Sequence, residues 1–381
     1  MVLMENLFNV DDITVEMPNQ TIGENIAKIS VIGVGGGGCN MINHMIQEGT
    51  HKIDLIAANT DLQVLNISRA PKKIQLGVKL TKGLGAGMKP EVGRDSAVES
   101  YEDIKNALKG TDIIFIAAGL GGGTGTGAAA IIAKAAKEVG ALTVSVVTKP
   151  FTWEGKKRAG LANLGLEELK KVSDSIIVVP NDRLLDIIDE NVGMKDAFKI
   201  IDNILYQAVN GMSEVILNPG NSDINTDFAD VKTIMQHKGM ALMGIGRAKG
   251  DDAALRALED AIDSPLLDKV SLSGAKGILI HFNIHPQVSL FAINNVMGSI
   301  HDNIDSNAEI IFGTTTDSTL QTDEVKITIV ATGFESKNDT DDDYDKNSEG
   351  QDNSNAKLSV NDENYLDIPP LMREYVVQYQ I

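Results

Sequence analysis

The sequence predicts an α/β fold with a Rossmann-like domain on a parallel sheet, a long central helix, a second and smaller α/β domain, and a disordered acidic tail. Three observations predict this arrangement. Short apolar runs alternate with helical patterns through the first half of the chain, one long helical pattern covers 195–217, and the composition turns acidic and poor in apolar residues from Glu335. The 381 residues are enough for two domains with a large core.

The first domain is expected to alternate strands with helices. Its apolar runs are continuous, which is typical of strands in a parallel sheet that is covered on both faces. The expected strands are 29–34, 54–59, 113–118, 142–147 and 175–179. The expected helices are 40–49, 93–109, 128–139 and 156–172. Ligands of such sheets bind at the carboxyl ends of the strands.

The central helix and the second domain follow. Apolar residues lie three or four apart over 195–217, and Asn218-Pro219-Gly220 ends that pattern. The second domain is expected to hold strands 240–246, 277–284, 309–313 and 326–332 and helices 251–261 and 288–303. The expected boundaries are a mobile arm at 1–24, the first domain at 25–194, the central helix and its connection at 195–223, the second domain at 224–334, a disordered acidic linker at 335–363, and a docking peptide at 364–381.

Composition excludes several classes of function. The formal net charge of −19 repels nucleic-acid phosphate and anionic lipid, so neither is expected as a direct partner. Cys39 is the single cysteine, which excludes a disulfide framework and a cysteine-based metal site. The amino-terminal residues lack the pattern of a signal peptide, and no apolar run reaches the roughly 20 residues of a membrane span. A cytoplasmic protein is therefore expected.

The glycine-rich run 119–127 follows an expected strand and precedes an expected helix. This placement puts bare backbone N–H groups at the positive end of a helix dipole, which suits a phosphate. Glycine allows close approach of the backbone, and the hydroxyls of Thr124 and Thr126 can donate to phosphate oxygens.

Two further glycine-rich segments support a phosphate site. Gly33, Gly35 and Gly38 match the dinucleotide pattern G-x-G-x-x-G, so a nicotinamide or flavin oxidoreductase is the competing interpretation. That interpretation requires an acidic residue at the end of the second strand, where Asp61 comes late. The segment 82–94 offers a third set of backbone N–H groups. Three such segments favour a nucleoside triphosphate, and the P-loop motif is absent.

The run Gly121 to Gly127, G-G-G-T-G-T-G, resembles the signature of the tubulin/FtsZ GTPase family. The resemblance spans 26–334 and includes further segments in order: 59–61, 81–94, 148–151, 154–158, 180–182 and 225–230. Tyr365-Leu366-Asp367-Ile368-Pro369 is similar to the carboxyl-terminal peptide of bacterial members of the family.

The resemblance implies a GTP- or GDP-binding pocket with Mg²⁺ held mainly through the phosphates, so no side-chain metal ligand is assigned. The residues that correspond to the pocket are Gly36, Gly37, Gly38, Cys39 and Asn40 in the first loop, Ala86 and Gly87 near the terminal phosphate, Gly123, Thr124 and Gly125 in the second loop, Glu154 and Arg158 at the ribose, and Asn181 and Asp202 at the guanine base.

Some of these roles have alternatives. Glu154 and Arg158 are spaced as an ordinary i,i+4 ion pair on a helix surface. Asn203 competes with Asp202 for the base, although a carboxylate suits guanine because it can accept from both N1–H and the 2-amino group. Cys39 replaces a glycine that many members of the family have, and its small side chain either packs under the helix or makes the pocket sensitive to thiol reagents.

Asp227 and Asp230 are the expected catalytic residues. Their spacing places both carboxylates on one face at a helix start, where simple capping is the alternative interpretation. A carboxylate pair beside a triphosphate can orient an attacking water or help to hold Mg²⁺. In the family this loop acts on the nucleotide of the neighbouring subunit, so the resemblance implies an active site that is completed between adjacent subunits.

The resemblance therefore implies an assembly-dependent GTPase that polymerises head-to-tail into filaments and forms the division ring at the bacterial septum, at mid-cell. Its implied partners are further copies of itself and, through 364–381, membrane adaptors and division proteins, so that contact with the membrane is only indirect. Two alternatives to this function remain: the oxidoreductase, and a polymer of the same family that hydrolyses little GTP. For the tail, the alternative to docking is a strand or helix that packs on the body.

Overall fold

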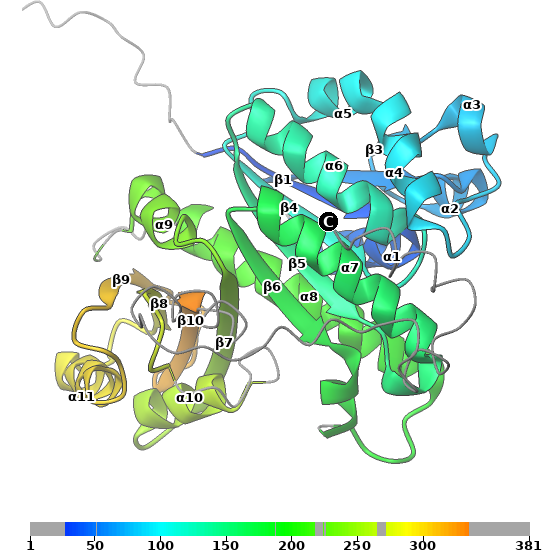
Figure 1. Ribbon diagram of the computed structural model, residues 1–381. Helices are drawn as coiled ribbons and strands as arrows, with labels where there is room; N and C mark the ends of the chain where they lie inside the picture. Colours follow the sequence, from blue (N-terminus) through cyan, green and yellow to red (C-terminus); the bar gives the residue numbers. More distant parts are fainter. Residues whose placement is uncertain are drawn as a thin grey trace, which may run out of the picture. The chain divides into compact units, whose positions relative to one another are not determined.

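The computed structural model describes residues 27–50, 52–186, 188–217, 224, 226–264 and 272–334 (Figure 1). The expected amino-terminal arm, acidic linker and docking peptide lie outside the described residues, as do Asn225 and most of the connection after the central helix. Among the residues that the structure describes, no helix is long and apolar enough to cross a lipid bilayer.

A parallel sheet organises the first half of the chain. Its strands are β1 (Ile29–Val34), β2 (Ile53–Asn59), β3 (Lys72–Gln75), β4 (Ile113–Gly119), β5 (Leu142–Lys149) and β6 (Ser175–Pro180). They lie in the order β3-β2-β1-β4-β5-β6, the order of a doubly wound dinucleotide-binding fold. Five of the six strands were predicted. The short edge strand β3 was not, because exposed lysines interrupt its apolar pattern.

Helices cover both faces of this sheet, as the continuous apolar strands predict. Val31 points to the face covered by α1 (Gly35–Gln47) and α8 (Met194–Leu217), and Ile32 points to the opposite face. That opposite face is covered by α4 (Pro90–Glu99), α5 (Tyr101–Leu108), α6 (Thr124–Glu138) and α7 (Lys156–Val172). The short helices α2 (Leu62–Ile67) and α3 (Val78–Thr81) lie in the connection between β2 and α4.

The expected helix 93–109 is broken in two at Ser100. Its hydroxyl accepts a hydrogen bond from the Gly77 amide at 3.1 Å, and its backbone leaves the helical region with φ −98° and ψ 19°. A contact with a distant turn therefore interrupts a continuous helical pattern.

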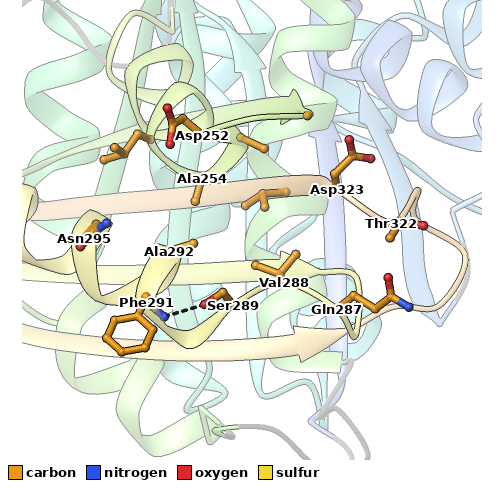
Figure 2. Close-up of a pocket in the computed structure, with 14 residues that line it drawn as sticks. Asp252, Ala254, Gln287, Val288, Ser289, Phe291, Ala292, Asn295, Thr322 and Asp323 are labelled. Carbon is orange, nitrogen blue, oxygen red and sulfur yellow. Dashed lines mark hydrogen bonds between the residues drawn. The ribbon is translucent and has the colours of Figure 1, made fainter.

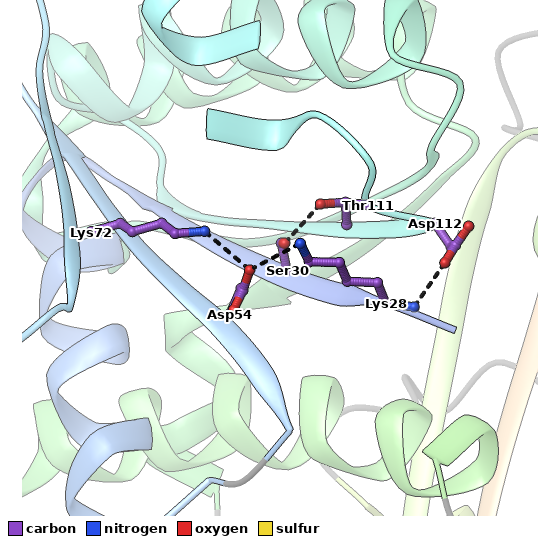
Figure 3. Close-up of polar contacts among 6 residues, drawn as sticks. All are labelled: Lys28, Ser30, Asp54, Lys72, Thr111 and Asp112. Atoms are coloured by element: carbon purple, nitrogen blue, oxygen red, sulfur yellow. Dashed lines mark hydrogen bonds and ion pairs between the residues drawn. The ribbon is translucent and has the colours of Figure 1, made fainter. Parts of the chain in front are cut away.

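Polar side chains join the strands at the amino ends of β1, β2 and β4 (Figure 3). Lys28 and Lys72 both pair with Asp54, at 3.6 and 3.1 Å, and the Lys28 amide donates to Asp112 at 2.8 Å. These contacts lie at the edge opposite the glycine loops, which leaves the carboxyl edge for a ligand.

The second half of the chain adds four strands to the same sheet. They are β7 (Met240–Lys249), β8 (Gly277–Ile284), β9 (Glu309–Thr316) and β10 (Glu324–Phe334), in the order β7-β10-β8-β9. The helices α9 (Phe228–Met235), α10 (Ala253–Ile262) and α11 (Leu290–His301) accompany them. Strands β6 and β7 pair through only two residue pairs, Ile176 with Met240 and Ile177 with Ala241. The sequence indicated two domains, and this narrow pairing joins their strands.

Candidate nucleotide-binding site

Two glycine loops meet where the strand order of the parallel sheet reverses. The chain passes from β1 into α1 at Gly35 and from β4 into α6 at Thr124, and β1 and β4 are neighbours. The first connection leads towards β2 and the second towards β5, so the two loops lie at the switch point where doubly wound sheets bind their ligands. The positive ends of two helix dipoles therefore lie at the same edge of the sheet, an arrangement that suits an anion.

Close packing explains the glycines of these loops. Gly35 has φ +72°, and a Cβ there would lie 2.9 Å from the Gly125 amide nitrogen. A Cβ on Gly125 would collide with the Gly119 carbonyl oxygen. The second loop thus occupies the space that a side chain at Gly35 would need, and it packs on itself at Gly125.

The third segment, 82–94, packs on the second loop. A Cβ on Gly123 would collide with the Gly87 carbonyl and lie 2.9 Å from the Ala86 Cβ. A Cβ on Gly93 would in turn collide with the Gly123 carbonyl. The structure therefore brings the three predicted segments into contact.

Threonine hydroxyls behave differently at the two positions of the second loop. The Thr124 hydroxyl lies 2.7 Å from the Thr60 hydroxyl, which follows β2. The buried Thr126 hydroxyl accepts a hydrogen bond from the Gly121 amide at 2.8 Å. Thr124 therefore contacts the residue that follows β2, whereas Thr126 braces the second loop from within.

The acidic residue that the oxidoreductase interpretation needed has another role. The Asp61 carboxylate accepts hydrogen bonds from the Gln63 and Val64 amides at 2.8 and 3.4 Å. It is therefore the N-cap of α2.

The tip of the first loop is exposed, whereas the two residues that follow it, including the Cys39 side chain, are buried. Gly36, Gly37 and Asn40 are exposed, whereas Gly38 and Cys39 are buried. Burial raises the pKa of the Cys39 thiol to about 11, and the Asn59 amide lies 3.7 Å from its sulfur. A buried, protonated thiol is unreactive, so Cys39 packs under the helix and can meet a ligand only through its backbone.

Glu154 and Arg158 form the ion pair that their spacing allowed. The Glu154 carboxylate also accepts from the Phe151 amide at 2.9 Å, and the Arg158 side chain is partly exposed. The backbone of Arg158 lies against Gly121, because a Cβ on that glycine would be 3.0 Å from the Arg158 carbonyl oxygen. The pair therefore adjoins the second phosphate loop.

Asn181 and Asp202 each carry a polar group that is shielded from solvent. Asn181 is buried, and its side-chain oxygen has no hydrogen-bond partner among the residues that the structure describes. Burial raises the pKa of Asp202 to about 7. Neighbouring Asn203 lies 3.4 Å from the His44 ring nitrogen of α1. Of the two candidates for the base, Asn203 is engaged in helix packing and Asp202 is a desolvated carboxyl.

Phe198 lies within the apolar pattern that the sequence shows over 195–217, but its side chain is 41% exposed. It lies one turn before Asp202 on the same face of α8, and its ring meets Phe151 edge-on at 6.0 Å. The i,i+4 spacing from Asp202 was the available signal. An aromatic ring beside a carboxyl suits a planar base, so Phe198 joins the candidate site.

Asp227 and Asp230 form a capping box at the start of α9. The Asp230 amide donates to Asp227 at 2.9 Å, and the Asp227 amide donates to Asp230 at 3.1 Å. The capping interpretation is thus confirmed, and it fixes both carboxylates while each retains a second oxygen. Helix α9 packs on β8 and β9, whereas α1 and α6 pack around β1 and β4. The capping box and the glycine-rich loops therefore belong to different parts of the fold.

This geometry defines a nucleotide-binding protein of the doubly wound class, with backbone loops for phosphate and a carboxyl beside an aromatic ring. Comparison with known proteins specifies the family. Residues 28–189 match the model of the tubulin/FtsZ family GTPase domain, and 239–335 match that of the FtsZ family C-terminal domain. The chain belongs to the tubulin/FtsZ family.

Solved structures agree with this assignment. An empty FtsZ dimer from M. jannaschii is 45% identical, with 81% of this chain and 88% of that chain covered and a TM-score of 0.73. A tryptophan-to-tyrosine mutant of M. jannaschii FtsZ is 44% identical over 81% and 91%, with a TM-score of 0.74. CetZ2 from Haloferax volcanii, a GTPγS-bound protofilament, shares the fold at 20% identity over 81% and 93%, with a TM-score of 0.69.

Membership of the family indicates guanine nucleotide binding and GTP hydrolysis. The residues present fit a guanine nucleotide, since a Cβ on Gly36, Gly87 or Gly122 would meet nothing within 4 Å and the orphaned Asn181 oxygen needs a donor. The oxidoreductase interpretation is wrong.

Proposed function

We propose that this chain polymerises head-to-tail, that Asp227 and Asp230 of one copy complete the GTPase site of the next, and that the filaments form the division ring at the cell septum. The observation that carries the proposal is the separation of the site's two halves: the phosphate loops gather at β1 and β4, and the carboxylate pair caps a helix that packs on β8 and β9.

Within one copy, we assign the nucleotide contacts by chemistry. Backbone N–H groups of Gly36 to Asn40 and Gly123 to Gly125 hold the phosphates, and Ala86 and Gly87 face the terminal one. Glu154 and Arg158 contact the ribose. Asn181 and Asp202 read the guanine, which stacks on Phe198, and the unpaired Asn181 oxygen and the desolvated Asp202 carboxyl support this assignment.

Mg²⁺ is proposed to be held mainly by the phosphates. Among the described residues, the structure contains no group of three or more His, Cys, Asp or Glu side chains that could hold a metal ion. The free oxygens of Asp227 and Asp230 would orient the attacking water, in a position that the capping box keeps rigid.

A contact between unlike surfaces does not close on itself, so it propagates into a filament. The contact between two copies completes the active site, and the GTP hydrolysis that follows weakens the same contact. Membrane adaptors and division proteins are proposed to bind 364–381, which would bring a cytoplasmic filament to the mid-cell membrane indirectly. A family polymer with little hydrolysis remains the second candidate, and turnover separates the two.

The first experiment measures phosphate release at increasing protein concentration. Specific GTPase activity should rise once filaments form, and light scattering should rise with it. Activity independent of concentration would refute a shared site.

The second experiment removes the carboxylate without removing the cap. Asp230→Asn keeps an oxygen that can accept from the Asp227 amide, so the helix start is retained while the charge is lost. The variant should bind GTP and assemble but hydrolyse poorly; wild-type turnover would show that Asp230 is only a cap.

The third experiment tests hydrolysis in trans. Gly123→Val should prevent nucleotide binding, because any Cβ there collides with Gly87. Neither Asp230→Asn nor Gly123→Val should turn over GTP alone. A mixture should regain activity, since the intact pocket of one meets the intact carboxylates of the other. No recovery at any ratio would argue against the shared site.

A further inference from the structure

The turn from Thr81 to Leu84 holds a lysine in a conformation that favours other residue types. The Leu84 amide donates a hydrogen bond to the Thr81 carbonyl at 3.0 Å. The two central residues, Lys82 and Gly83, have φ values of +51° and +80°. Positive φ at both central positions defines a type I′ turn, in which Asn-Gly is the favoured pair. A lysine side chain cannot make the local hydrogen bonds with which asparagine supports this conformation, so the turn itself does not account for Lys82.

Lys82 is one of three described residues other than glycine that have positive φ; the others are Lys52 and Asp252. Aspartate adopts this conformation more readily than most residues, and Asp252 does so in the wall of a cavity of about 370 Å³, opposite Asp323 (Figure 2). Lys52 precedes β2, at the edge of the sheet opposite the glycine loops. Lys82 alone of the three lies in a segment that packs near those loops. Backbone strain of this kind is concentrated at functional sites.

A second lysine occupies an unfavourable position at the start of α4. Lys89 is the N-cap residue of that helix, and its side chain makes no capping hydrogen bond. Asparagine, aspartate or serine is preferred at an N-cap, because the side-chain oxygen accepts from an amide of the first turn. The positive end of the helix dipole also repels a cation. The Lys89 side chain is therefore unfavourable for the helix that it precedes.

Both lysines flank the segment that is assigned to the terminal phosphate, Ala86 and Gly87. The Lys89 amide donates to the Ala86 carbonyl at 3.3 Å, so Lys89 closes the turn that contains Gly87. The start of α4 packs on the first turn of α6, since a Cβ on Gly127 would collide with the Pro90 carbonyl. Lys89 therefore lies where two helices begin side by side.

The turn of Lys82 is tied to the second loop through Thr60. The Thr81 hydroxyl and the Gly85 amide both donate to the Thr60 carbonyl, each at 3.3 Å. The Thr60 hydroxyl in turn lies 2.7 Å from the Thr124 hydroxyl. The backbone on either side of Lys82 is thus fixed to a residue that contacts the second loop.

The phosphate contacts assigned above are backbone amides and include no side-chain cation, and Arg158 is paired with Glu154. Lys82 and Lys89 are exposed, and neither forms an ion pair with a residue that the structure describes. They belong to the stretch 62–94, which has seven Lys or Arg residues and a single acidic residue in a chain of net charge −19. Positive charge is therefore concentrated in the segment where a terminal phosphate would add negative charge.

We propose that Lys82 and Lys89 contact the terminal phosphate of GTP and set the preference of the site for the triphosphate over GDP. This inference rests on the proposed function, which assigns Ala86 and Gly87 to that phosphate. A lysine ammonium binds phosphate as a compact point charge. Both side chains occupy locally unfavourable positions because their charges act on the ligand, and GDP lacks the group that they contact.

Competition between GTPγS and GDP measures this preference. The protein is kept below its assembly threshold, so that contacts between copies do not contribute. Lys82→Asn and Lys89→Asn should each lower the ratio of triphosphate to diphosphate affinity by about fivefold, the size of one exposed charge contact, and should leave GDP affinity unchanged. Lys89→Arg should keep the ratio, because it keeps the charge. Lys79→Gln removes an exposed lysine of the same stretch from α3 and is the matched control. An equal loss in this control would reduce the effect to net charge and overturn the inference.

Stability measurements separate a phosphate contact from a structural role. Because asparagine suits both the type I′ turn and the N-cap, Lys82→Asn and Lys89→Asn should each raise the urea midpoint of the nucleotide-free protein while they lower the affinity ratio. A structural role predicts the reverse: a lower midpoint and an equal loss of affinity for both nucleotides. That result, or an unchanged ratio in either variant, would overturn the assignment.

The outcomes also separate this inference from the proposed function, because binding is measured on single copies. If Asp230→Asn loses turnover while the two lysine variants keep the wild-type ratio, the shared site stands and the phosphate contacts are rejected. If the lysine variants lose the ratio while the specific activity of the wild type does not depend on concentration, the phosphate contacts stand and the shared site is rejected.

Discussion

Replacing Asp202 by asparagine should stabilise the nucleotide-free protein while it weakens guanine binding. The pKa of Asp202 rises from 3.8 to about 7 because the carboxyl is buried. A raised carboxyl pKa means that the folded state holds the proton more tightly than the unfolded state does. Wild-type stability should therefore fall as pH rises from about 4 to about 7 and then level off.

The magnitude follows from the size of the shift. One pKa unit corresponds to about 1.4 kcal/mol, so a shift of about three units sets an upper limit of about 4 kcal/mol at pH 8. Asp202 is only partly buried, and solvent screening should reduce the effect to about 2 kcal/mol. An asparagine side chain cannot ionise, so the variant should be more stable than the wild type at pH 8 and nearly equal to it at pH 4.

Urea unfolding of the nucleotide-free protein at pH 4, 6 and 8 measures this difference, and titration with labelled GDP measures binding. The variant should bind roughly 10- to 100-fold more weakly, because it loses a charged acceptor for two guanine donors. Asp196→Asn is the matched control on the same helix: a hydrogen bond and charge from Lys199 lower the pKa of Asp196, so its loss should not raise stability at pH 8.

Two results would refute the reasoning. A variant that is less stable than the wild type at pH 8, or a stability difference that does not shrink on acidification, would show that Asp202 is not desolvated. Wild-type nucleotide affinity in Asp202→Asn would show that another residue reads the base.

Three further predictions concern the loops around the nucleotide. Gly125→Val should abolish GTP binding and lower stability by several kcal/mol, since its side chain has to displace the Gly119 carbonyl; calorimetry with and without nucleotide measures both, and normal binding would contradict the packing. Cys39 should resist alkylation in the folded protein at pH 8 and react at the ordinary rate in urea, because burial raises its pKa to about 11; mass spectrometry follows the reaction, and rapid native labelling would show an accessible thiol. Glu154→Gln should weaken nucleotide binding by no more than about tenfold, because the Phe151 amide keeps an oxygen acceptor; Glu154→Ala should cost more, and equal losses would mean that the hydrogen bond is unimportant.

Most secondary structure and the position of the glycine-rich loops could be predicted from local sequence. A continuous apolar run such as 113–118 is a buried strand in nearly any environment, and a glycine run between a strand and a helix has few conformations other than a tight loop. The predicted positions of the helix ends were less accurate. Helix α1 begins at Gly35, five residues before the predicted start, because packing on the second loop holds glycines in a helix that their propensity disfavours.

The candidate site was only partly visible in the sequence. The spacing of Asp227 and Asp230 allowed both a cap and a catalytic pair, and the structure confirms the cap without testing catalysis. Phe198 was missed because one helical pattern does not distinguish a core position from an exposed one when the residue lies at the border of the apolar face.

By itself, then, the sequence determined the α/β class, the parallel strands, the three glycine-rich segments and the family resemblance, because these depend on neighbours in the chain. Only the tertiary structure decided the break at Ser100, the pairing of β6 with β7, the engagement of Asn203 by His44 and the desolvation of Asp202. Each of these depends on segments that are distant in sequence. Hydrophobic periodicity specifies which face of an element is buried, but the partner that buries it is selected by packing of the whole chain.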